Sequence, residues 1–102
     1  MSGDPLDIVI GADEAKRDAE QAASHARDAD KAEAEGNPEQ VIVELKKALY
    51  TDPTDLDLAF RLAYALDLVG EEEEAISMYE QVCETQPAPI NALINLAVLY
   101  ED

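Results

Sequence analysis

The chain has 102 residues, 47% of them hydrophobic, and its 24 acidic residues against seven basic ones give a formal net charge of -17. This length suits a single domain with one core, and the acidity argues against direct binding to nucleic acid or anionic membranes, because phosphate binding needs clustered Lys and Arg. All the basic residues precede residue 62, so the chain beyond Arg61 electrostatically favours a basic partner.

The N-terminal segment is predicted as a flexible arm, residues 1–11, before a helical domain over 12–102. Its apolar run at residues 6–10 lies between Pro5 and Gly11 and has no second strand with which to pair. The start of the chain lacks the pattern of a signal peptide, and no apolar run approaches the roughly 20 residues that span a bilayer. A single cysteine, Cys83, fits a reducing compartment. We therefore expect a cytoplasmic protein in which Cys83 is a small buried hydrophobe rather than a reactive thiol.

The first predicted helix, about 12–35, carries a seam of alanines at alternating spacings of three and four: Ala12, Ala15, Ala19, Ala22, Ala26 and Ala29. Such a heptad seam allows close approach of a second helix, although each alanine buries little area. The seam is consistent with a solvated helical extension or with a dedicated coiled-coil contact.

An internal repeat organises the remainder of the chain. Residues 22–55 form a first copy, 56–89 a second, and 90–102 open a third. Matched pairs include Ala29 with Ala63, Gly36 with Gly70, Glu39 with Glu73, Ile42 with Ile76, Thr51 with Thr85 and Pro53 with Pro87. Small residues, a turn glycine and a proline after the second helix are what a repeated helix-turn-helix unit needs.

Capping signals place four further helices at about 38–51, 55–69, 72–85 and 89–101. Asn37 followed by Pro38 and Gln40 predicts a capped helix start with a capping box. Thr54 with Asp57 is expected to cap the next helix. The acidic run 71–74 is interpreted as a solvated helix start, where negative charge meets the positive end of the helix dipole.

These residues resemble the tetratricopeptide repeat (TPR), in which a large residue, Leu-Gly, Tyr, Ala, an aromatic and Pro recur at fixed positions. The second copy matches with Ala59, Leu62, Ala63, Leu66, Gly70, Ala75, Tyr79 and Pro87. The first copy departs from the pattern at His25 and Asp28, where the family usually has apolar residues. The resemblance implies an all-α fold: antiparallel helix pairs stacked as a short right-handed superhelix of about two and a half repeats, with an extended N-terminal helix.

In TPR proteins the first helices of successive repeats line a concave groove that receives a peptide or a partner helix. The resemblance implies a groove formed by Ala26, Arg27 and Asp30, by Asp57, Phe60, Arg61, Tyr64 and Asp67, and by Asn91, Ile94, Asn95 and Val98. Phe60 and Tyr64 offer rigid apolar area, the asparagines can bind a peptide backbone, and Arg61 can pair with a carboxylate. The basic clamp that binds chaperone tails in one TPR subfamily is missing, so an acidic groove for a Lys- or Arg-bearing segment is the better hypothesis.

We expect a non-catalytic protein-interaction scaffold with no cofactor and no metal site, because one histidine and one cysteine leave little from which to build a catalytic centre. An alternative is the accessory part of a transcription protein: the stretch also resembles the N-terminal TPR region of bacterial proteins that continue into a domain like the C-terminal domain of the RNA polymerase α subunit. The last helix has no successor in this sequence to cover its apolar residues, so a homodimer through that helix, or by exchange of an end element, is also expected.

Overall fold

The computed structural model describes residues 5–85 and 88–101, with side chains from Arg17 onward, and these residues form five helices. The helices are α1 (Pro5–Ala34), α2 (Pro38–Thr51), α3 (Leu56–Leu68), α4 (Glu72–Cys83) and α5 (Ile90–Glu101). The prediction of an all-α protein is therefore confirmed for this part of the chain. None of these helices combines the length and the apolar character needed to cross a bilayer.

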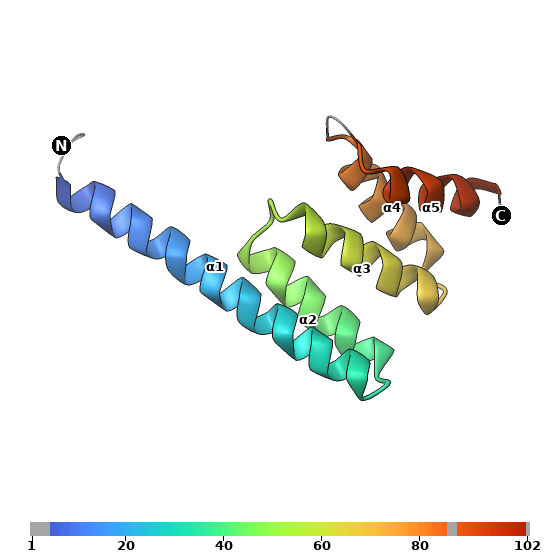
Figure 1. The fold of residues 1–102 in the computed structure, drawn as a ribbon, viewed down its shortest axis with the longest axis horizontal. Helices are drawn as coiled ribbons and strands as arrows, with labels where there is room; N and C mark the ends of the chain where they lie inside the picture. Colours follow the sequence, from blue (N-terminus) through green and yellow to red (C-terminus); the bar gives the residue numbers. More distant parts are fainter. Residues whose placement is uncertain (1–4, 86–87, 102) are drawn as a thin grey trace.

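Consecutive helices pack on one another. Helices α1 and α2 form an antiparallel pair, α3 and α4 form a second pair, and α5 packs on α4 (Figure 1). The molecule measures 54 × 34 × 18 Å, and its shortest dimension is less than two helix diameters of about 10–12 Å each. No helix in such a thin arrangement can be surrounded by others, so each pair depends on its neighbour to cover its apolar side.

The two helix pairs turn in the same way, one repeat apart in the sequence. Gly36 and Gly70 have φ of 71° and 84°, a backbone conformation that side chains with a Cβ rarely adopt. The hydrogen bonds around them correspond pair by pair: Gly36 N to Glu33 O and Asn37 N to Ala32 O (3.0 and 2.9 Å), Gly70 N to Asp67 O and Glu71 N to Leu66 O (3.1 and 2.9 Å). Both turns are Schellman motifs, and the prediction that the glycines lie in the bends is confirmed.

The core recurs with the same period. Equivalent residues of the two copies are both buried at five pairs of positions: Ala29 and Ala63, Ala32 and Leu66, Val41 and Ala75, Leu45 and Tyr79, Ala48 and Val82. Two ion pairs also join the helix pairs, Asp30 of α1 with Arg61 of α3 and Lys46 of α2 with Glu74 of α4. Exposed pairs of this kind each contribute about 1 kcal/mol or less, so the shared apolar core holds the pairs together.

The capping predictions are confirmed in part. Asn37 accepts a hydrogen bond from the backbone N–H of Gln40 at 3.2 Å, as predicted, but the Gln40 side chain donates to Glu44 and does not complete a capping box. Helix α3 is capped by Asp55, which accepts from the N–H groups of Asp57 and Leu58. The prediction of Thr54 as this cap was wrong, because its hydroxyl bonds to Asp52 instead.

The predicted start of the first helix was also wrong. Helix α1 begins at Pro5, so residues 5–11, assigned to a flexible arm, are helical. Proline is well tolerated at the first helical position, and the interior Gly11 costs only about 1 kcal/mol relative to alanine. Neither signal is strong enough to end a helix that continues for 30 residues.

Replacing Gly70 with alanine should lower the free energy of unfolding by about 1–2 kcal/mol, the usual cost of placing a Cβ in the left-handed conformation. A Cβ at this position would meet no atom within 4 Å, so the loss is expected from backbone strain alone. Urea unfolding of Gly70→Ala and Gly70→Asn separates backbone strain from steric contact of the new side chain. Asparagine tolerates the left-handed conformation better, so it should lose less stability than alanine if strain is the cause. An alanine variant as stable as the parent chain would contradict the assignment.

Candidate functional site

The candidate site is the accessible face of α3 together with the neighbouring surface of α5. Phe60 lies at its centre, and a hollow opens on either side of it. The first hollow, about 340 Å³, lies between α3 and the α1–α2 turn. The second, about 540 Å³, lies between the start of α3 and the start of α5.

The first hollow has mainly apolar walls. From α3 it is lined by Phe60, Arg61, Tyr64, Ala65 and Leu68, and from the first helix pair by Glu33, Gly36, Asn37, Pro38, Val41 and Leu45. Tyr64 is 51% exposed, so an aromatic face remains available beside this hollow. In protein interfaces, the residues that contribute most to the binding energy are often aromatic side chains that lie in or beside apolar pockets.

The second hollow connects the predicted groove residues of α3 with those of α5. It is lined by Leu56, Asp57 and Phe60 of α3, by Val82 of α4, and by Pro89, Ile90 and Asn91 at the start of α5. Asn91 is exposed, so both its amide N–H groups and its carbonyl oxygen are available to a peptide backbone.

A buried aromatic residue of the core packs against Phe60 and supports this face. Tyr79 of α4 is fully buried, and its ring meets that of Phe60 edge to face, with ring centroids 5.7 Å apart. The Asn95 side chain of α5 donates a hydrogen bond to the Tyr79 hydroxyl at 3.2 Å. Burial raises the pKa of Tyr79 above its ordinary value, although the bond from Asn95 opposes the shift. Tyr79 therefore fixes Phe60 and α5 relative to each other.

The structure brings together only some of the predicted groove residues. Asp57, Phe60, Arg61, Tyr64 and Asn91 line the two hollows. Ile94 and Val98 of α5 are each 55% exposed but line neither hollow. Asp67 and Asp30 also lie outside them, as do Ala26, which is partly buried against the core, and Arg27, which is exposed.

Two residues have roles that the sequence did not suggest. Arg61, expected to bind a partner's carboxylate, already forms an ion pair with Asp30 of α1. One amide hydrogen of Asn95, expected to face a peptide, is used by Tyr79. Several further lining residues of the first hollow, such as Val41, Leu45 and Pro38, come from the first helix pair. Repeat position alone could not identify them, because the packing of α2 against α3 brings them to the site.

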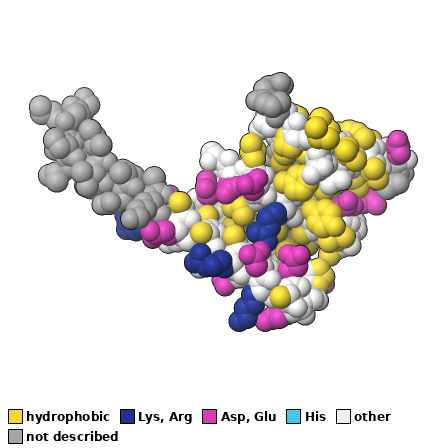
Figure 2. Space-filling model, in the orientation of Figure 1, with side chains coloured by type: hydrophobic (Ala, Val, Ile, Leu, Met, Phe, Trp, Pro, Cys, Tyr) yellow, Lys and Arg dark blue, Asp and Glu magenta, His cyan; other side chains and the backbone are white. Residues whose placement is uncertain are grey.

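Charge is unevenly distributed over the molecule. Figure 2 shows Lys and Arg side chains mainly toward α1 and α2, and hydrophobic side chains gathered where Figure 1 draws α3, α4 and α5. In the first hollow, Arg61 forms an ion pair with Asp30. Its charge is therefore not free to neutralise Glu33, which lines the same hollow. Asp57 borders the second hollow. The face therefore combines apolar surface with uncompensated negative charge.

Cys83 of α4 is half-buried against the core. Burial raises the pKa of its thiol, which disfavours the reactive thiolate. The interpretation of this cysteine as a small hydrophobe agrees with that environment.

No family model matches the chain, and no curated protein matches it.

Replacing Tyr79 with phenylalanine should lower the free energy of unfolding by about 1 kcal/mol through loss of the bond to Asn95. A double-mutant cycle with Asn95→Ala measures the coupling between the two side chains. Tyr50→Phe is the matched control, because Tyr50 is 90% exposed and should lose nothing. Additive effects of Tyr79→Phe and Asn95→Ala would contradict a bond that stabilises the α4–α5 contact.

Proposed function

We propose that the chain is a TPR-like scaffold that binds a peptide or a partner helix along the face of α3 and α5. The recurrence of one period in the sequence, in the turn geometry and in the core positions supports this assignment. The first copy, 22–55, and the second, 56–89, each have the length of a TPR unit, about 34 residues. In the TPR each such unit is a helix-turn-helix that buries its apolar side against the next.

The observation that carries the functional proposal is the position of Phe60 between two hollows, held by the buried Tyr79. A fixed aromatic anchor loses little conformational freedom on binding, so more of its contact energy appears as affinity. An extended segment crossing α3 could occupy both hollows at once, and the exposed Asn91 could bind its backbone.

Charge selects the class of partner. Among the described residues that line the two hollows, Glu33 and Asp57 are acidic, and the one cation, Arg61, is paired with Asp30. Residues 62–102 contain neither Lys nor Arg. A negative surface of this kind raises the association rate of a basic segment and disfavours an acidic one. The proposed ligand is therefore a peptide or helix with apolar side chains and at least one Lys or Arg.

Binding of a labelled peptide with alternating apolar and basic residues should weaken about tenfold or more when Phe60 is replaced with alanine, the loss expected for an interface anchor. Tyr50→Ala is the matched control, because it removes an aromatic that is 90% exposed on α2 and lies outside both hollows. Affinity should also fall as salt is added. A preference for an acidic peptide of the same length, or binding that ignores salt, would overturn the proposal.

A second candidate function is self-association through α5. Three residues of α5 are exposed where their equivalents in the second copy are buried: Leu93, Ala97 and Tyr100 correspond to Ala59, Ala63 and Leu66. In α3 this side of the helix is part of the core. We propose that in α5 a second copy covers it, since Ile90 to Tyr100 carry no charged side chain to repel an identical helix.

Sedimentation equilibrium tests this homodimer. The parent chain should associate as its concentration rises, and Leu93→Glu should shift it toward the monomer, because dimerisation would bury an unpaired carboxylate. Tyr50→Glu adds the same charge at an exposed position of α2 and should leave association unchanged. A parent chain that stays monomeric at high concentration, or equal effects of the two variants, would exclude association through α5.

A further inference from the structure

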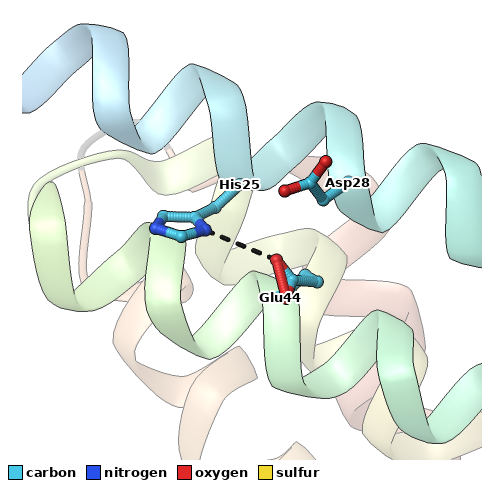
Figure 3. A group of neighbouring side chains, drawn as sticks. All are labelled: His25, Asp28 and Glu44. Atoms are coloured by element: carbon cyan, nitrogen blue, oxygen red, sulfur yellow. Dashed lines mark hydrogen bonds and ion pairs between the residues drawn. The ribbon is translucent and has the colours of Figure 1, made fainter.

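Three side chains with metal-ligating groups converge between α1 and α2, away from the α3–α5 face. His25 and Asp28 lie one turn apart on α1, and Glu44 reaches toward them from α2 (Figure 3). One ligand atom from each of the three residues lies within 4.8 Å of the other two. An imidazole and two carboxylates on two helices are a ligand set suited to a divalent transition metal.

The helix-pair fold itself does not require polar residues at these positions. The equivalent residues of the second pair are Ala59, Leu62 and Met78. The first two are buried, and Met78 packs against the core. All three members of the polar cluster therefore replace apolar packing residues of the second copy, where the same architecture is built without them.

Glu44 is held in an orientation that suits a ligand. Its side chain is only 8% exposed. One carboxylate oxygen, Oε1, accepts hydrogen bonds from Gln40 Nε2 and Lys47 Nζ, both at 3.2 Å. The other, Oε2, faces His25 Nδ1 at 3.4 Å. In metal sites, hydrogen bonds from neighbouring side chains regularly hold a ligating carboxylate in its orientation.

We propose that His25, Asp28 and Glu44 bind a zinc ion that clamps α1 to α2. A tetrahedral zinc with ligand bonds of about 2.0–2.1 Å places neighbouring ligand atoms about 3.4 Å apart. The His25 Nδ1 to Glu44 Oε2 distance of 3.4 Å already has this value. Asp28 is exposed, so its side chain can rotate to close the remaining gap, and water takes the fourth position.

The neighbouring Lys47 opposes a cation but does not block the site. Its ammonium contacts Oε1, whereas the proposed zinc ligand is Oε2, and its side chain is 54% exposed and can move into solvent. The hydrogen bond from Lys47 is also the largest reason why the pKa of Glu44 lies below its ordinary value despite burial. The imidazole favours zinc over magnesium or calcium, which prefer oxygen ligands.

Titration of the full chain with zinc chloride at neutral pH, followed by nitrogen NMR of the imidazole, tests the site. His25 is the one histidine of the sequence, so the spectrum reports on this residue alone. Zinc should shift its Nδ1 resonance strongly, magnesium should not, and calorimetry should give one bound zinc per chain. Thermal unfolding should move to higher temperature with zinc, because the ion binds only when α1 and α2 are packed.

Asp28→Asn should weaken zinc binding about tenfold or more, the scale on which changes at a metal site act, and it leaves the buried Glu44 in place. Asp18→Asn is the matched control, since it makes the same charge change at an exposed residue of α1 and should have no effect. Glu44→Gln should abolish binding, with circular dichroism checking that the variant folds. An unshifted His25 resonance, or equal weakening by Asp28→Asn and Asp18→Asn, would overturn the site in favour of diffuse binding by the acidic surface.

Discussion

The structure depends on one constraint: an antiparallel pair of helices is too thin to bury its own apolar side. With a shortest dimension of 18 Å, the molecule has no central helix among its described residues, and its largest fully buried side chains are Tyr79, Leu45, Leu66 and Val82. Each such side chain contributes about 1.5–3 kcal/mol by leaving water. Packing of α2 on α3 and of α4 on α5 therefore completes the core that each pair begins, and a face that lacks a neighbour is left apolar and exposed.

The candidate site is a consequence of the same constraint. Each α3 residue either packs against α4 and α2 or remains on the open side, and Phe60 lies at the boundary, half-buried against Tyr79 yet accessible from two hollows. A core contact thus fixes the aromatic centre of the proposed binding surface on a helix. The lack of basic residues beyond Arg61 is the basis of the proposed preference of this surface for a basic partner.

Features that depend on local sequence could be predicted, and features that depend on packing between pairs could not. Glycine is favoured where a helix ends with a positive φ, so the turns at Gly36 and Gly70 could be predicted. The order of the helices could be predicted from the repeat. The internal partners of Arg61 and Asn95 could not be foreseen, because Asp30 and Tyr79 lie 31 and 16 residues away and meet them only after stacking. The start of α1 was misjudged since proline and glycine weaken a helix locally without deciding whether it forms.

The first helix pair shows why a polar cluster would be retained beside an otherwise apolar fold. Its α1 contributes Ala22, Ala29 and Ala32 to the core, whereas the second pair has Leu66 where the first has Ala32. Alanine buries little area, so this contact gains less from the hydrophobic effect than its counterpart. Helix α1 is also more than twice as long as α2 and projects beyond it (Figure 1). The hydrogen bond between His25 and Glu44 lies in this alanine-rich contact, and the proposed zinc ion would add a second link there that fixes the direction in which the long helix projects.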